Sequence, residues 1–85
     1  MSTPPPATPR LIDRVLLSRM KRFGVERTRT HAYLEGQRTT LCGLRIYHAD
    51  TRRWRRDQAC PASRLRRAVG CARCERILVA RGLCA

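Results

Sequence analysis

The chain has 85 residues and a formal net charge of +13, with 19 lysine and arginine side chains against 6 aspartates and glutamates. A chain of this length forms one small domain, whose hydrophobic core alone gives only marginal stability. The charge favours an anionic partner, nucleic acid first and an acidic protein surface second. The five cysteines are an odd number without a secretory signal, so metal ligation in a reducing cytoplasm fits better than a disulfide framework.

The first seven residues are rich in serine, threonine and proline. This composition predicts a disordered tail over residues 1–7, followed by a single domain over residues 8–85. The apolar run around Leu16 is short and flanked by charge. We therefore expect no transmembrane helix and no membrane partner.

An N-terminal helix is predicted to follow the tail. Thr8 and Pro9 form a helix start, and apolar residues then recur at helical spacing from Leu11 to Phe23. Gly24 is expected just beyond its end. Its apolar side is expected to cover the next element, although a basic amphipathic helix also suits a membrane surface or a partner protein.

A β-hairpin is predicted over residues 30–43. Strand-favouring residues flank Glu35-Gly36-Gln37-Arg38, and Gly36-Gln37 as the central turn residues put glycine where a type II′ turn requires it. In that register His31 lies opposite Cys42 on the same face, with Cβ atoms about 4.5–5.5 Å apart. One imidazole and one thiolate are then within reach of a single ion.

The other half of the predicted site is the Cys-x-x-Cys pair of Cys71 and Cys74. Together with His31 and Cys42 it makes a Cys₃His set, one of the standard tetrahedral sets for structural zinc. We expect one Zn²⁺ per chain, and folding that depends on it. The alternative is four unrelated buried residues, since free cysteine is among the most buried residue types.

The order His, about ten residues, Leu-Cys-Gly, an insert, and then Cys-x-x-Cys resembles a group of small zinc-finger proteins of high-GC Gram-positive bacteria and their phages. The resemblance covers about residues 30–80 and implies that His31, Cys42, Cys71 and Cys74 are the zinc ligands. Most members are uncharacterised, so it implies zinc more than any activity. The N-terminal segment, the basic insert and two extra cysteines depart from the pattern.

Residues 43–70 form a very basic insert, in which four arginines surround the only tryptophan. Basic patches with an aromatic ring are typical of proteins that bind single strands or RNA, because the ring stacks on a base. The alternative is a solvated charge run whose tryptophan packs on the domain. A second basic segment is predicted to be a short helix capped by Ser63. The predicted nucleic-acid contacts of the insert are Arg52, Arg53, Trp54, Arg55, Arg56, Arg64, Arg66 and Arg67.

A final helix is predicted from Cys74 to Arg81, ending at Gly82. Ile77, Leu78 and Ala80 are expected to face inward. Arg73 and Arg76 are expected to face outward and join the nucleic-acid contacts, as in zinc modules that present a helix to nucleic acid.

Two other readings of the cysteines stay open. Cys60, Cys71, Cys74 and Cys84 form a four-thiolate set similar to the iron–sulfur site of WhiB-like regulators, although the last spacing is longer and the Gly-Trp-Gly-Gly turn of that family is absent. A second site from His48, Cys60 and Cys84 would lack a fourth protein ligand.

Catalysis finds no support in the pattern. The chain contains no asparagine, so it cannot form the residue triplet of an HNH-type nuclease. His48 has no nucleophile or carboxylate pair around it in the sequence. A Cys₃His site is also coordinatively closed, whereas catalytic zinc keeps an open position.

The sequence thus predicts a small α+β zinc-stabilised domain with an N-terminal helix, a hairpin, a basic insert and a helix after Cys-x-x-Cys. The expected function is nucleic-acid binding, most simply of DNA, as a cytoplasmic regulatory or accessory protein, in keeping with a phage origin, and not as an enzyme. The alternative is a protein-interaction module that binds and modulates an acidic surface of a host protein.

Overall fold

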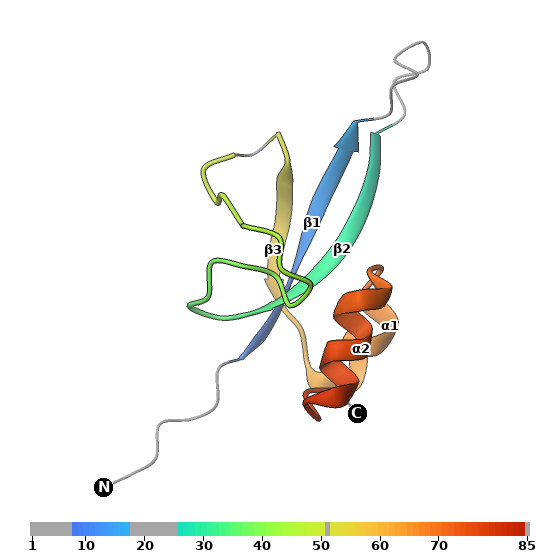
Figure 1. Cartoon of the computed structure of the whole chain (residues 1–85). Helices are drawn as coiled ribbons and strands as arrows, with labels where there is room; N and C mark the ends of the chain where they lie inside the picture. Colours follow the sequence, from blue (N-terminus) through green and yellow to red (C-terminus); the bar gives the residue numbers. More distant parts are fainter. Residues whose placement is uncertain (1–7, 18–25, 51, 85) are drawn as a thin grey trace, which may run out of the picture.

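A computed structural model describes residues 8–17, 26–50 and 52–84 (Figure 1). Over these residues it contains a three-stranded antiparallel sheet and two helices, so the expected α+β class is confirmed. None of the described helices is long and apolar enough to cross a membrane. The elements are β1 (Pro9–Leu17), β2 (Glu26–Leu34), β3 (Trp54–Ala59), α1 (Ala62–Ala68) and α2 (Ala72–Ala80).

The expected N-terminal helix is wrong, because its first half forms strand β1. Leu11 and Ile12 are 2% and 1% exposed and belong to two different core clusters, which only a strand with both faces covered allows. Such a strand reads as a nearly continuous apolar run, which also fits helical spacing. The remainder of the expected helix and Gly24 lie outside the described residues, as does the expected tail.

The strand order is β2-β1-β3, with β1 in the centre. β1 pairs with β2 along their whole length, so that Ile12 lies opposite His31. The pairing of β1 with β3 is interrupted by a bulge, where Arg56 takes a φ of 56°. Trp54 and Asp57 are three positions apart and would face opposite ways on a regular strand. The extra residue of the bulge puts both on one face, where Trp54 meets Ile12 and Asp57 meets Tyr33.

The expected hairpin of residues 30–43 is also wrong, since β2 pairs with β1 instead. The turn after β2 has Glu35 and Gly36 at its centre, with Gln37 N–H donating to Leu34 O at 2.9 Å. The turn therefore lies one place earlier in the chain than predicted, and Gly36 is its second central residue, where its φ of +87° is typical. The following segment touches β2 through one backbone hydrogen bond, Leu41 N–H to Ala32 O at 2.8 Å. The full-length pairing that β1 offers outweighs this single contact.

Residues 38–46 fold back on themselves as a small loop. Ile46 N–H donates to Arg38 O at 2.8 Å, and Thr39 and Arg45 form an isolated bridge. Gly43, with a φ of +97°, closes the tip of this loop. The loop carries Cys42 and places it beside β2.

The two faces of the sheet are covered by different parts of the chain (Figure 1). The C-terminal helices cover one face and supply the cover that was expected from an N-terminal helix. The cluster on that face contains Leu11, Ala32, Leu65, Val69, Cys71, Cys74 and Leu78. The other cluster contains Ile12, Tyr33, Ile46 and Trp54.

The helices are close to their predicted positions. α1 begins after Pro61, so the predicted cap Ser63 lies inside the helix. α2 ends as predicted, because Gly82 has a φ of +65° and Leu83 N–H donates to Leu78 O at 2.9 Å, as in a Schellman motif. Leu78 is fully buried and Ala80 is exposed, so the inward prediction is wrong for Ala80.

Candidate metal centre

The four predicted ligands come together at the outer edge of β2. His31 lies on that strand, and Cys42 is carried by the loop of residues 38–46. Cys71 is the N-cap residue of α2 and Cys74 lies in its first turn. The backbone anchors this convergence, because Leu41 N–H and Gly70 N–H donate to Ala32 O and Thr30 O, the outward-facing carbonyls of β2.

The ligand atoms are spaced for one metal ion. The Nδ1 or Nε2 atom of His31 and the Sγ atoms of the three cysteines all lie within 4.8 Å of one another. His31 Nδ1 is 3.4 Å from Cys42 Sγ and 3.7 Å from Cys74 Sγ. Tetrahedral zinc with its usual bond lengths separates sulfur from nitrogen by about 3.6 Å and sulfur from sulfur by about 3.8 Å. The cluster can therefore hold one metal ion.

The environment of the site suits ligation. His31 is 4% exposed, and burial lowers the pKa of its imidazole, with the charges of Arg29 and Arg14 adding to the effect. The ring is therefore neutral at pH 7 and has a free lone pair. Nδ1 faces the cysteines, so Nδ1 is the nitrogen placed to bind a metal ion.

The two thiols of the Cys-x-x-Cys pair differ in acidity. Burial on its own opposes ionisation of Cys71, but hydrogen bonds from the backbone of Cys74, the side chains of Cys74 and Cys42, and the backbone of Arg73 prevail and lower its pKa. Burial, with the neighbouring Cys42, raises the pKa of Cys74 to about 12. A cation is the partner that makes a fully buried Cys74 thiolate favourable.

Thr40 supports the site, although sequence reasoning did not single it out. Its side chain is buried, and its Oγ1 accepts the N–H of Leu44 at 3.0 Å. The same oxygen lies 3.0 Å from Cys42 Sγ, so its own proton is free to point at that sulfur. The spacing Thr-x-Cys-Gly in a tight loop was the available signal, because a hydroxyl two residues before a ligand reaches its sulfur.

Trp54 is part of the core. It is 4% exposed, and its ring meets the edge of His31 with a centroid distance of 6.1 Å. The guanidinium of Arg14 lies 5.0 Å from the centroid of the indole ring. Trp54 therefore offers no open face to a base, and the predicted stacking is replaced by support of a metal ligand.

The other two cysteines stay outside the cluster. Cys60 and Cys84 are half-buried and pack against the core, but in the described part of the chain neither joins a group of metal-ligating side chains. The four-thiolate set expected for an iron–sulfur cluster is therefore not assembled. His48 lies apart from both and faces Asp57, so the second site considered from the sequence is not assembled either.

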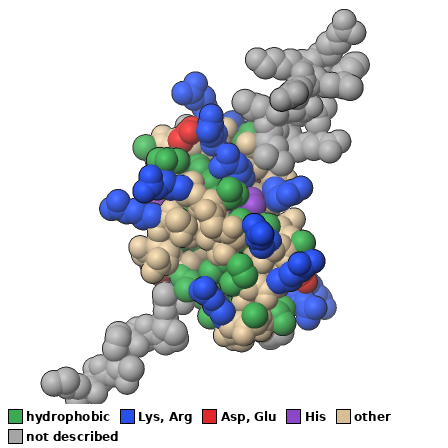
Figure 2. Space-filling model, in the orientation of Figure 1, with side chains coloured by type: hydrophobic (Ala, Val, Ile, Leu, Met, Phe, Trp, Pro, Cys, Tyr) green, Lys and Arg blue, Asp and Glu red, His purple; other side chains and the backbone are tan. Residues whose placement is uncertain are grey.

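All nine arginines of the predicted nucleic-acid set are exposed. Figure 2 shows basic side chains distributed around the visible face, with acidic ones in only a few places. The arginines come from two parts of the fold, the segment around the start of β3 and the two helices α1 and α2, and Figure 1 shows the start of β3 apart from those helices. Among the described residues, five of the nine have no acidic partner, namely Arg52, Arg64, Arg67, Arg73 and Arg76.

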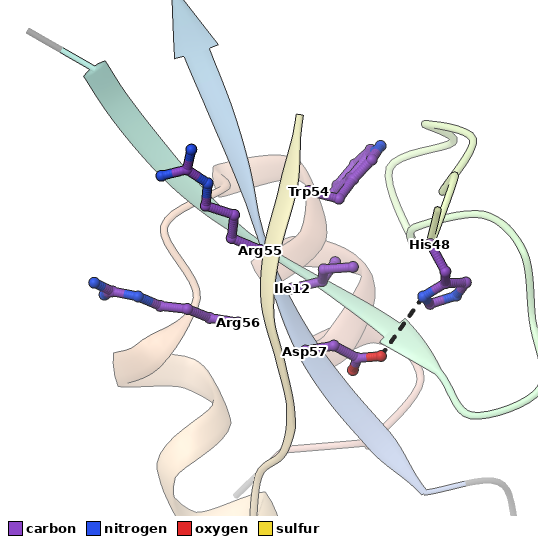
Figure 3. Close-up of a pocket in the computed structure, with 6 residues that line it drawn as sticks. All are labelled: Ile12, His48, Trp54, Arg55, Arg56 and Asp57. Atoms are coloured by element: carbon purple, nitrogen blue, oxygen red, sulfur yellow. Dashed lines mark ion pairs between the residues drawn. The ribbon is translucent and has the colours of Figure 1, made fainter. Parts of the chain in front are cut away.

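A hollow of about 490 Å³ lies beside β3 and brings a histidine to a carboxylate (Figure 3). His48 Nδ1 is 3.7 Å from Asp57 Oδ2. That carboxylate is already engaged, because Tyr33 Oη–H donates to Oδ2 at 2.6 Å and Arg10 Nε–H to Oδ1 at 2.8 Å. Burial opposes ionisation of Asp57, but these two hydrogen bonds prevail and lower its pKa. Asp57 therefore serves as a structural clamp that joins β3 to Arg10 of β1 and Tyr33 of β2.

Comparisons with protein-family models, with curated proteins and with solved structures find no match for this chain. The site is therefore defined by its own geometry, which is a buried set of three thiols and one imidazole able to hold one metal ion.

Proposed function

We propose that the chain is a zinc-stabilised domain that binds nucleic acid, as a regulatory or accessory protein. The observation that carries the zinc assignment is the convergence of His31, Cys42, Cys71 and Cys74 within 4.8 Å. Thiolates favour Zn²⁺, Cu⁺ and iron–sulfur clusters, and a closed tetrahedral set of three sulfurs and one nitrogen is typical of structural zinc. The proposed role of the metal is to hold the fold, not to activate a substrate.

The zinc assignment is tested on the purified full chain. Elemental analysis should give one zinc per chain, and a strong chelator at pH 7 should abolish the dispersed amide signals in NMR spectra. Structural zinc contributes an apparent ~10–16 kcal/mol in small zinc modules, as much as the whole stability of a domain. A chain that is folded without metal, or that carries iron, contradicts the assignment.

The exposed arginines support nucleic acid as the partner. Four acidic residues already face arginine side chains, and among the described residues Arg52, Arg64, Arg67, Arg73 and Arg76 have no acidic partner. Guanidinium groups bind phosphates bidentately. The proposed binding therefore depends mainly on the phosphate backbone, with little preference for base sequence.

Salt dependence tests the nucleic-acid assignment. With about five phosphates neutralised, the slope of log K against log salt on duplex DNA should be about −4.5. Replacing Arg52, Arg53, Arg55 and Arg56 together by Ala should weaken binding to all sequences alike and flatten the slope. A matched control replaces Arg29, Arg38, Arg45 and Arg81, which are also exposed, and should have a smaller effect. Equal binding by wild type and the first variant contradicts the assignment of that patch.

One observation favours an acidic protein as the alternative partner. Val79 is 49% exposed and lines a hollow of about 400 Å³ on the helices, together with Arg66 and Arg76. An apolar side chain flanked by arginines is a common arrangement at protein interfaces. A pull-down from host lysate with and without nuclease treatment separates the two functions, because a protein partner survives the nuclease.

A further inference from the structure

The turn before β3 carries an exposed aromatic ring that the sequence reasoning passed over. Tyr47 is 56% exposed, the most exposed of the large hydrophobic side chains in the described residues. Asp50 N–H donates to Tyr47 O at 2.9 Å, and Asp50 O accepts from Arg53 N–H and Trp54 N–H at 3.3 and 3.0 Å. Two successive turns therefore bring the ring near the arginines that precede β3.

These turns enclose an open hollow of about 610 Å³, called the Tyr47 hollow here. Its size falls in the range of small-ligand sites, which are about 300–1,000 Å³. One aromatic residue and two arginines are among the residues that line it. Its lining residues are Tyr47, Ala49, Asp50, Arg52 and Arg53.

Asp50 is the one acidic group in this lining, and the loop already uses it. Its Oδ1 accepts the backbone N–H of Arg52 at 3.2 Å, and its Oδ2 lies 3.8 Å from Arg53 Nε. The contact orients Arg53 through Nε and leaves the terminal nitrogens of that guanidinium for another anion. The guanidinium of Arg52 has no acidic partner among the described residues, so the hollow keeps a net positive charge.

We propose that the Tyr47 hollow binds one nucleotide of single-stranded nucleic acid, with the base stacked on Tyr47 and the phosphate held by Arg52 and Arg53. This assignment rests on the proposed nucleic-acid function and places it at one site. In a duplex both faces of each base are covered by neighbouring bases, whereas an unpaired base has a free face for the tyrosine ring. An acidic peptide would use the arginines but would leave the ring without a matching partner.

The test compares single-stranded and duplex affinity in the zinc-loaded full chain. Fluorescence anisotropy measures binding of a labelled single strand, of a duplex of the same length and of a labelled Asp/Glu-rich peptide. Tyr47→Ala should weaken single-strand binding by about 5- to 150-fold, the value of one stacked base, and change duplex binding by less than about twofold. Tyr47→Phe should bind like the wild type, because the ring is kept.

Leu44→Ala is the matched control, since Leu44 is an exposed apolar residue close in sequence that does not line the hollow. It should leave all affinities unchanged, and zinc content confirms that each variant is folded. If Tyr47→Ala loses equal affinity for the single strand and the duplex, or loses none for either, the nucleotide site at the Tyr47 hollow is overturned. The proposed nucleic-acid function would then still stand. If Tyr47→Ala weakens binding of the Asp/Glu-rich peptide and of neither nucleic acid, the partner of the hollow is a protein and the nucleotide site is overturned. A wild-type chain that binds no nucleic acid overturns both the hollow and the proposed function.

Discussion

The residues of the candidate metal centre are far apart in the sequence, whereas Trp54 and its arginines are adjacent. Two of the ligands, His31 and Cys74, are 43 positions apart, yet the four ligand atoms lie within 4.8 Å. Trp54 and the arginines beside it are consecutive in the sequence, yet their side chains lie in different environments. The tryptophan is 4% exposed in the core, and Arg53 and Arg55 are exposed.

The difference has a physical cause. A strand sends successive side chains to opposite faces, so residues that are neighbours in sequence do not share a surface. An indole buries about 150–250 Å² of largely apolar surface, whereas a guanidinium loses its hydration on burial. A cluster of mixed residue types is therefore divided by the fold. A set of candidate metal ligands can be gathered by it, because thiols and a neutral imidazole tolerate burial and one ion can bind all four.

The largest expected effect comes from breaking the metal centre. Cys74→Ser, Cys42→Ser, Cys71→Ser and His31→Ala should each release zinc and unfold the chain, measured by elemental analysis and circular dichroism. Cys60→Ser is the matched control, since Cys60 is half-buried outside the cluster, and it should cost at most about 1–3 kcal/mol. If Cys60→Ser releases zinc and His31→Ala does not, the assigned ligand set is wrong.

The next effect tests whether Trp54 belongs to the core. Trp54→Ala should lower the free energy of unfolding by about 3–5 kcal/mol in chemical denaturation, as for other buried aromatic residues. It should also weaken zinc binding, because the indole packs against the ligand His31. The neighbouring control Arg52→Ala should stay within about 0.5 kcal/mol of the wild type. Unchanged stability together with lower single-strand affinity would return Trp54 to the binding surface.

A smaller effect sharpens the description of the metal centre. Thr40→Val removes the hydroxyl that faces Cys42 Sγ and keeps the shape, so zinc affinity in a competition titration should fall by about 10- to 100-fold. Thr40→Ser keeps the hydroxyl and should retain most of the affinity. Equal losses in the two variants would show that the packing of the threonine methyl group matters and the hydrogen bond does not.

The smallest effect is a loss of stability at high pH only, and it comes from the hydrogen bond between Tyr33 and Asp57. Burial raises the pKa of Tyr33 to about 12, and the hydrogen bond to Asp57 adds to this. Its contribution to the free energy of unfolding is therefore full below pH 10 and is lost as the pH rises towards about 12. Tyr47→Phe leaves Tyr33 as the only tyrosine, so phenolate absorbance reports it directly.

That titration also has an internal control. Adding Asp57→Asn to Tyr47→Phe removes the carboxylate partner, and the midpoint should move from about 12 towards the ordinary value of 10.0. A midpoint near 10 before that change would mean that Tyr33 is open to solvent.

The sequence by itself determined the parts that depend on residue chemistry. The four candidate ligands were predicted from residue type and spacing, because few side chains bind a soft metal ion and they occur in recognisable pairs. The end of α2 at Gly82 could also be predicted from the local sequence, since only glycine takes a positive φ there at little cost. The exposure of the nine arginines followed from the cost of burying a guanidinium.

Only the tertiary structure decided between helix and strand for residues 9–17. An apolar run such as Leu11 to Leu17 satisfies both a helix with one buried side and a strand with two buried faces. The choice depends on having β2 and β3 as neighbours and cover on both sides, and no local pattern contains that information. The same long-range packing put Trp54 inside, on the face that the bulge at Arg56 lets it share with Asp57.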